Sequence, residues 1–186
     1  MIIVYHRLKD APCCCPIKRF EQEVKLAKKY GFKLTFDDGL KEHITIALPI
    51  LKKYKMKAIF FPITSKKVFP GVRWIGQEFM TWDNIKELHE NGMEIGCHTH
   101  THPRLSRLSK TDQEIEIKTS TRIITRKIEK PVWFSYPYSS FNNATVSLIK
   151  KYGYLYGLTS EEPDYLRLKR TDTNEFNIWC KDKIER

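Results

Sequence analysis

Residues 33–62 read KLTFDDGLKEHITIALPILKKYKMKAIFFP, and this stretch decides the expected fold. Residues 33–36 and 58–62 are short runs with aromatic and apolar side chains, which is typical of buried strands. Residues 42–54, which lie between them, have apolar side chains at helical spacing. A strand, a helix and a second strand in this order predict two parallel strands joined by a crossover helix.

The same alternation continues in both directions along the chain. Gly31, Gly92 and Gly153 each follow a helical pattern, at the position where a left-handed residue ends a helix. Thr81 and Ser109 are residues of the kind that begin helices. The further expected strands cover residues 2–5, 93–97, 132–136, 154–158 and 166–170, and the further expected helices cover residues 17–30, 81–91, 111–128 and 144–152.

These patterns predict the α/β class and a single domain over residues 1–186, because no internal repeat or linker interrupts them. Seven strands can form an open doubly wound sheet or a closed barrel, and periodicity does not separate the two. A regular eightfold barrel takes about 250 residues. A barrel of this length would therefore be trimmed and irregular. Residues 171–186 form a polar tail that the patterns leave unassigned.

The chain is strongly basic, with 33 Lys and Arg residues against 22 Asp and Glu and a formal net charge of +11. This balance favours an anionic partner, which nucleic acid, an anionic cell-wall polymer or a membrane surface would each provide. No nucleic-acid-binding motif accompanies the charge, so we expect no nucleic acid partner. An acidic glycan or a lipid-linked sugar would also explain it.

The sequence contains no recognisable targeting signal, and its cysteine pattern indicates reduced thiols. No apolar run approaches the ~18 residues of a membrane span, and only four residues precede Tyr5, so we expect neither a membrane span nor a signal peptide. For a full-length chain the expected location is the cytoplasm. The five cysteines, three of them consecutive at Cys13–Cys15, match no disulfide framework, so reduced thiols are expected. A metal or redox role for that run is the alternative, and the oligomeric state is not predicted.

Two acidic residues, Asp37 and Asp38, directly follow the strand of residues 33–36. Adjacent carboxylates at a strand end repel each other unless a cation lies beside them, which favours a functional site. The alternative is that Asp38 and Gly39 only form a turn before the next helix.

Three of the six histidines lie within residues 98–102, in the sequence HTHTH. His98 and His102 have the i, i+4 spacing that lets two imidazoles on one helical turn bind a metal, while His100 points elsewhere. One aspartate and these two histidines would form a set of three protein ligands with open positions for water and substrate. The remaining carboxylate, Asp37, could then accept a proton from the metal-bound water as general base.

TFDDG at residues 35–39, followed about 60 residues later by HTHTH, resembles the first two motifs of the polysaccharide deacetylase family. This family is also called the NodB-homology or carbohydrate esterase family 4 deacetylases. The opening VYHRL at residues 4–8 and GMEIG at residues 92–96 agree with it, and the resemblance covers about residues 2–170.

The resemblance implies a distorted (β/α) barrel of about seven strands. It implies that Asp38, His98 and His102 bind a divalent metal, Zn²⁺ first and Co²⁺, Ni²⁺ or Fe²⁺ as alternatives, and that Asp37 is the base. The implied reaction is the removal of N-acetyl groups from N-acetylhexosamine units of a glycan. The backbone N–H of Tyr138 would help to bind the oxyanion.

The chain departs from the family pattern at two places. The third motif, usually Arg-x-Pro-Tyr-Gly, is matched by SYPYS at residues 135–139, so Ser135 replaces an arginine that normally orients the base. No histidine follows His102, and Asp164 is a poor match to a later motif, so the usual general acid is missing. His6 follows the first strand and would open on the same barrel face as Asp37. It is expected there as general acid or as a hydrogen-bonding support, while His43 and His89 are expected in helices of the outer ring.

Trp74, Trp82 and Tyr138 could stack on sugar faces, although such aromatics are as often part of a core. Two other functions remain open. One is hydrolysis of O-acetyl esters or other C–N bonds by the same fold. The other is glycan binding without catalysis, which the lost arginine and missing histidine would favour and the retained Asp37 opposes.

Overall fold

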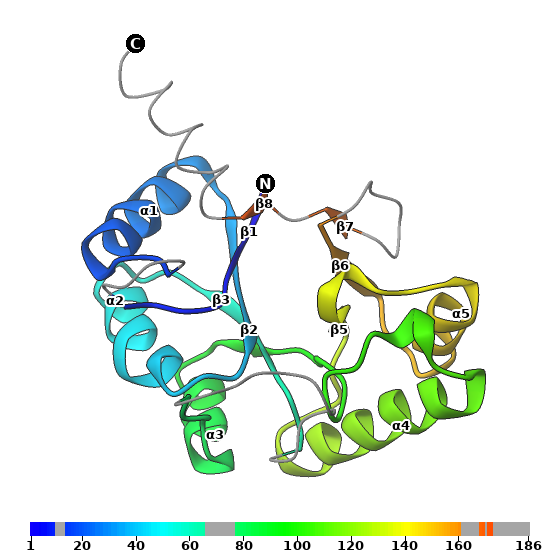
Figure 1. Cartoon of the computed structure of the whole chain (residues 1–186). Helices are drawn as coiled ribbons and strands as arrows, with labels where there is room; N and C mark the ends of the chain where they lie inside the picture. The colour runs from blue at the N-terminus through cyan, green and yellow to red at the C-terminus, as the bar shows by residue number, and fades with distance from the viewer. Residues whose placement is uncertain (10–13, 66–76, 161–167, 170, 173–186) are drawn as a thin grey trace.

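Strands and helices alternate along the chain in the computed structural model, which describes residues 1–9, 14–65, 77–160, 168–169 and 171–172 (Figure 1). The strands are β1 (Ile2–Tyr5), β2 (Lys33–Asp38), β3 (Ala58–Pro62), β4 (Glu94–Ile95), β5 (Trp133–Ser135), β6 (Tyr156–Thr159), β7 (Leu168–Lys169) and β8 (Thr171–Asp172). The α-helices are α1 (Ile17–Tyr30), α2 (Leu48–Lys53), α3 (Trp82–Glu90), α4 (Lys110–Lys127) and α5 (Asn143–Lys151). Three short turns of other helical types are η1 (His43–Ala47), η2 (Leu105–Arg107) and η3 (Pro137–Ser139).

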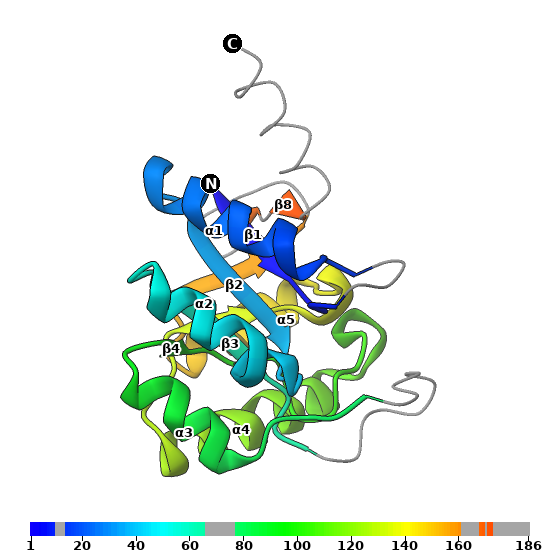
Figure 2. The ribbon, with the colours of Figure 1, turned by 90° about the vertical axis from the view of Figure 1, so that its left-hand side faces the viewer.

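The described strands pair in parallel and form two sheets. One has the order β4-β3-β2-β1-β8 and the other the order β5-β6-β7. A parallel bridge between Cys97 and Phe134 joins the first sheet to the second. The two sheets face each other with the α-helices on the outside, as Figures 1 and 2 show. The predicted α/β class and the distorted, trimmed barrel in a single domain are confirmed.

The join between the sheets explains why β4 is short. Gly96 N–H donates to the Phe60 carbonyl of β3 at 2.8 Å, but the next residue, Cys97, donates to the Trp133 carbonyl of β5 at 3.0 Å. A Cβ on Gly96 would lie 2.3 Å from the Phe61 ring, so this close approach requires glycine. The chain therefore changes its pairing partner at Gly96, and the expected strand over residues 93–97 is reduced to two residues.

Alternate residues of the strands enter two different cores, as the two-residue period of a strand requires. Phe36 and Phe60 belong to the large core between the strands and the helices, where their rings stack with centroids 4.6 Å apart. Removing either ring would cost about 3–5 kcal/mol of stability. A smaller core lies between the two sheets and consists of Ile59, Phe61, Trp133 and Leu158.

Most predicted element boundaries agree with the structure to within two residues. Gly31, Gly92 and Gly153 adopt the expected left-handed conformation, with φ of 70°, 76° and 85°. Thr81 and Ser109 are N-caps whose side chains accept backbone N–H groups. The strand after residue 33 is longer than expected and includes both aspartates. The expected strand over 166–170 is seen at residues 168–169, and its other residues lie outside the described part.

The sequence patterns leave residues 171–186 unassigned, and in the structure Thr171–Asp172 form β8, which pairs with β1. One expectation about secondary structure is wrong in part. The helix expected over residues 42–54 begins as the π turn η1 and becomes α-helical only at Leu48. Pro49 has no N–H to donate to the carbonyl four residues before it, which explains the wider turn. None of the described helices is long and apolar enough to cross a membrane.

Candidate active site

The candidate site lies where the parallel strands end at their carboxyl termini, which is the functional end of such barrels. β2 ends with Asp37 and Asp38, and His6 directly follows β1. Tyr5 of β1 is the register partner of Phe36 of β2, so regular pairing brings His6 beside Asp37. The loop of residues 98–102 follows β4, and Ser135 is the last residue of β5.

The two carboxylates share one site only because the strand ends irregularly. Successive side chains of an extended strand point to opposite faces, so Asp37 and Asp38 would diverge. Asp38 instead has a left-handed backbone with φ of 74°. Gly39 follows with φ of 77°, and a Cβ there would lie 3.0 Å from the Pro62 Cα. The conformation at residues 38–39 therefore turns the second carboxylate into the site and requires glycine after it.

The expectation that His98 and His102 share a helical turn is wrong. Residues 98–102 form an irregular loop in which Thr99 and His102 have positive φ, 66° and 64°. His102 N–H donates to Thr99 Oγ1 at 3.0 Å. The buried Glu116 carboxylate of α4 accepts bonds from His100 N–H, Thr101 N–H and the Thr101 hydroxyl at 2.9, 2.8 and 2.6 Å. The loop is therefore shaped by hydrogen bonds from another element rather than by helical periodicity.

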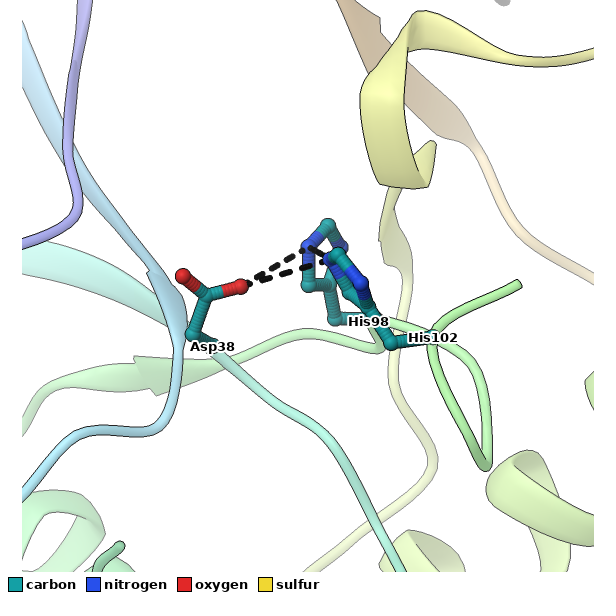
Figure 3. Close-up of side chains that lie close together, drawn as sticks. All are labelled: Asp38, His98 and His102. Carbon is teal, nitrogen blue, oxygen red and sulfur yellow. Dashed lines mark hydrogen bonds and ion pairs between the residues drawn. The ribbon is translucent and has the colours of Figure 1, made fainter. Parts of the chain in front are cut away.

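The irregular loop still brings the three expected ligands together (Figure 3). Asp38 Oδ1 lies 3.5 Å from His98 Nε2 and 3.4 Å from His102 Nε2. All three side chains are buried, and one potential ligand atom from each lies within 4.8 Å of the others. His100 is not part of this group, because its Nδ1 is 2.8 Å from the Thr64 hydroxyl.

The chemistry of these three groups fits a divalent cation. The Ser135 carbonyl lies 2.8 Å from His98 Nδ1 and accepts a hydrogen bond from it, so in the neutral imidazole Nε2 carries the lone pair that a cation would bind. The two Nε2 atoms lie 3.2 Å apart, a distance at which two lone pairs repel unless a proton or cation lies between them. One carboxylate and two imidazoles are a donor set that suits Zn²⁺ and similar metals.

The protonation tendencies of these residues agree with a site built for positive charge. Burial opposes the charge of Asp38, but its bond to His98 and the nearby histidines outweigh this and lower the pKa. Burial likewise opposes protonation of His98, but the charge of Asp37 and the bond to Asp38 raise its pKa. Burial and the neighbouring His98 lower the pKa of His102 to about 3. His102 is therefore a neutral imidazole, which is the form that binds a metal.

Asp37 is buried beside this group, and Ser135 contacts it directly. Ser135 Oγ donates to Asp37 Oδ2 at 3.1 Å. His98 Nε2 and His6 Nε2 lie 4.0 and 3.9 Å from the same oxygen. The His6 side chain is 54% exposed, so it borders both the carboxylate and solvent. Ser135 thus supplies a donor to Asp37 at the position where the family usually has an arginine.

Tyr138 lies in the η3 turn and contacts His102. Tyr138 and Ser139 both have positive φ, 57° and 51°. The Tyr138 ring packs edge-on against His102 with centroids 4.7 Å apart, and the Arg104 guanidinium lies 4.2 Å from the Tyr138 ring centroid. Left-handed backbone in residues with side chains is unfavourable and is concentrated at functional sites. Within the described residues, five of the six such positions belong to this site, and Lys55 is the sixth.

Of the two tryptophans predicted to contact sugar, Trp82 lies in the described part of the chain. Trp82 packs against the large core and lines a cavity of about 130 Å³ together with Gly39 and Thr64. Trp74 and Asp164 lie outside the described residues. Cys14, Cys15 and Cys97 are free thiols, and burial raises the pKa of Cys15 to about 12, which makes that thiol unreactive.

His43 is a residue that the sequence reasoning misplaced. It was expected on the outer ring but is completely buried in η1, with its Nε2 2.7 Å from the His6 carbonyl oxygen. The available signal was that His43 follows Asp37 by only six residues. The helical pattern around His43 favoured a position on the outer ring instead. His89 does lie on the outside, in α3, with Nδ1 3.8 Å from Glu129 Oε1.

The fold is a parallel α/β barrel, and at the carboxyl ends of its strands lies a buried Asp-His-His group that could hold a cation. The chain belongs to the polysaccharide deacetylase family, whose model matches residues 25–157. The protein YxkH of Bacillus subtilis (strain 168) is 32% identical over 186 residues, covering 86% of this chain and 64% of YxkH. A poly-β-1,6-N-acetyl-D-glucosamine N-deacetylase of Staphylococcus aureus (strain MSSA476) is 30% identical over 145 residues, covering 69% of this chain and 47% of that protein. The chain thus spans less than two thirds of the length of these relatives.

Solved structures agree with this assignment. The Streptococcus pyogenes deacetylase PplD, solved in complex with acetate, is 25% identical and superposes with a TM-score of 0.80 over 92% of this chain and 90% of PplD. IcaB from Ammonifex degensii has the same fold, with a TM-score of 0.81 over 97% of this chain and 96% of IcaB at 20% identity.

Proposed function

We propose that this chain is a metal-dependent hydrolase that removes N-acetyl groups from N-acetylhexosamine units of a glycan. The observation that supports this most directly is the buried group of Asp38, His98 and His102 with the Asp37 carboxylate beside it. A divalent cation held by these three residues would supply Lewis acidity toward a carbonyl oxygen and a water molecule. Zn²⁺ is the first expectation, and Co²⁺, Ni²⁺ or Fe²⁺ are the alternatives.

Asp37 is the proposed general base. Its carboxylate is buried, borders the cation site and accepts a bond from Ser135, so one oxygen is held while the carboxylate takes a proton from the attacking water. A glycan-binding protein without catalysis would not need this second carboxylate. The hydrogen bond from Ser135 also compensates for the missing family arginine, because Asp37 retains a hydrogen-bond donor that orients its carboxylate.

Tyr138 is the proposed backbone donor to the oxyanion. Tyr138 is the second residue of η3 and its ring packs against His102, so its backbone lies beside the proposed metal site. The exposed Tyr138 ring beside it could contact the sugar. Trp74 and Trp82 remain predicted sugar contacts.

His6 is the proposed proton donor to the leaving amine. Its Nε2 lies 3.9 Å from the Asp37 carboxylate, and the side chain borders solvent, where an amine product would leave. The alternative is that His6 only supports Asp37 by hydrogen bonding. The S. aureus relative suggests poly-β-1,6-N-acetylglucosamine as the first polymer to test. The net charge of +11 is compatible with anionic substituents on the substrate.

The test is acetate release by the purified chain, first stripped of metal with a chelator and then loaded with one equivalent of Zn²⁺, Co²⁺, Ni²⁺ or Fe²⁺. The substrates are β-1,6- and β-1,4-linked N-acetylglucosamine oligomers, and acetylated xylan represents O-esters. We expect acetate and an equal amount of free amine from an N-acetylated oligomer, and neither without metal. Acetate from xylan alone would make the chain an esterase. Stoichiometric metal without acetate from any substrate would contradict the proposal and favour glycan binding.

A further inference from the structure

His43 is a buried histidine that the proposed chemistry does not use. It is 0% exposed, and its ring lies against the rings of Phe36 and Phe60, with centroids 5.3 and 6.0 Å away. Its Nε2 lies 2.7 Å from the main-chain carbonyl oxygen of His6. A carbonyl oxygen can only accept, so Nε2 carries the proton and His43 donates.

The other ring nitrogen of His43 provides no further hydrogen bond that would stabilise the fold. Within the described part of the chain, its Nδ1 has no hydrogen-bond partner. Burial lowers the pKa of His43 to about 4, so the ring is neutral near pH 7. A polar ring with one unsatisfied nitrogen is unfavourable in an aromatic core, where a leucine or phenylalanine would pack without that cost. The bond from Nε2 to His6 is thus the interaction that distinguishes histidine from an apolar residue here.

Glu42, the residue before His43, contacts the same segment. Its Oε1 accepts the Leu8 N–H at 2.9 Å and lies 3.7 Å from Arg7 Nε. The carbonyl of His6 and the N–H of Leu8 are therefore both held by consecutive side chains. These side chains lie at the start of η1, and π turns of this kind often occur at functional sites.

The His6 side chain itself lacks such restraint. It is 54% exposed, and its Nε2 approaches Asp37 Oδ2 at 3.9 Å. The position of its imidazole thus depends on where the backbone of residues 6–8 is held.

We propose that His43 is a positioning residue, which holds the main chain of His6 so that the His6 imidazole stays within reach of Asp37 and the leaving amine. This inference rests on the proposed function, in which His6 takes part in proton transfer. Glu42 acts with His43 by holding Leu8. A displacement of about 1 Å at a reacting group can cost about 100-fold in rate, so losing the bond from His43 should slow turnover without affecting metal binding.

The test compares His43→Leu with His43→Gln, in the wild type and in the His6→Gln background, on the Zn²⁺-loaded chain. His43→Leu fills the space without a donor, whereas the glutamine amide can donate to the same carbonyl. In the wild type we expect His43→Leu to lower kcat about 10–100-fold with unchanged KM and metal content, and His43→Gln to recover most of the loss. In the His6→Gln background the same Leu substitution should change kcat by less than about 3-fold, because its target is gone. His89→Leu, a histidine on the outside of the barrel, is the matched control and should leave kcat unchanged.

An equal loss of kcat in both backgrounds would overturn the inference, since a merely structural histidine acts independently of His6. Failure of His43→Gln to recover kcat would also overturn it. If His43→Leu does not fold, Glu42→Ala replaces it, because that side chain is 19% exposed and its loss removes the bond to Leu8. It should lower kcat in the wild type and not in the His6→Gln background. An active wild type with unaltered kcat in His6→Gln refutes this inference alone, whereas a metal-loaded wild type without activity refutes the proposed function and this inference with it.

Discussion

The two sheets of the barrel contribute to the site by different means. The five-stranded sheet contributes His6, Asp37 and Asp38 from the ends of β1 and β2, whose register brings His6 beside Asp37. The three-stranded sheet contributes Ser135 at the end of β5 and Tyr138 in a left-handed turn. The loop of residues 98–102, here called the histidine loop, lies between them, directly after the bridge from Cys97 to Phe134.

This difference separates residues held by regular pairing from residues held by side-chain bonds. Asp37 depends on the β-ladder, which many backbone bonds support. The loop at 98–102 depends on Thr99 and Glu116, so a change in one side chain can displace a ligand. Substitutions of a residue held by the β-ladder and of a residue that holds the loop should therefore have different effects. We expect the first to lower the reaction rate and the second to lower the metal affinity.

The largest effect is expected for the three proposed metal ligands, which come from β2 and from the loop after β4. Asp38→Ala, His98→Ala or His102→Ala should abolish metal binding and acetate release together, because two remaining protein ligands make an incomplete site. His100→Ala is the control and should keep its metal. Metal analysis after dialysis measures this, and stoichiometric metal with unchanged affinity in His102→Ala would contradict the ligand assignment.

A slightly smaller effect is expected for Asp37, the proposed base, which the β-ladder holds. Asp37→Asn should retain metal while the rate falls by about 10²–10⁴, the range typical of losing a general base. Metal content and acetate release are measured on the same sample. Near-normal turnover would show that Asp37 is not the base.

His6→Gln tests the other residue that β-register brings to the site. If His6 is the acid, the metal affinity should hold, the rate should fall by about 10² or more, and the alkaline limb of the pH–rate profile should disappear. If His6 only supports Asp37, metal affinity should fall about 10–100-fold while the profile keeps its shape. Full activity with unchanged metal affinity is incompatible with both roles.

Glu116→Gln tests the loop of residues 98–102, which side-chain hydrogen bonds hold. The substitution removes the charge that three donors of the histidine loop share, so metal affinity should fall about 10–100-fold. The rate at saturating metal should change much less, because the base is untouched. Glu114→Gln is the matched control on the same helix, where the side chain bonds Lys151 at the surface. Titration with a competing chelator measures both affinities, and equal values for Glu116→Gln and wild type would show that the loop needs no brace from α4.

The smallest effect is expected at Arg104, over the Tyr138 ring. Among the described residues no carboxylate pairs with Arg104, so its charge is open to a substrate anion. Arg104→Met should raise KM about 3–10-fold for an N-acetylated oligosaccharide bearing carboxylates at low salt and leave a neutral oligomer unaffected. Arg107→Met, in η2, is the control. A parallel change for both substrates would mean that the effect is packing on Tyr138 rather than charge.

Local sequence patterns predicted much of the fold and part of the site arrangement. The helix over residues 17–30 has the expected ends, and Gly31 ends it as predicted. Asp38, His98 and His102 also lie close together as expected, but the reason given for the histidines was wrong. Their spacing imitates a helix, whereas bonds to Thr99 and Glu116 shape the loop. His43 failed for a similar reason, because a helical pattern does not tell which side of a helix meets the active end of the barrel.

The amino-acid sequence by itself determined the α/β class, the order of the elements and the two motifs that contain the acidic and histidine residues, since these depend on spacing within single elements. Only the tertiary structure decided the distances at which residues from β1, β2, the loop after β4 and β5 converge. It also decided that Asp38 has a left-handed backbone conformation, and that Ser135 bonds both Asp37 and His98. The physical reason is that barrel closure and positive φ set distances between elements, and neither is written in the periodicity of any one of them.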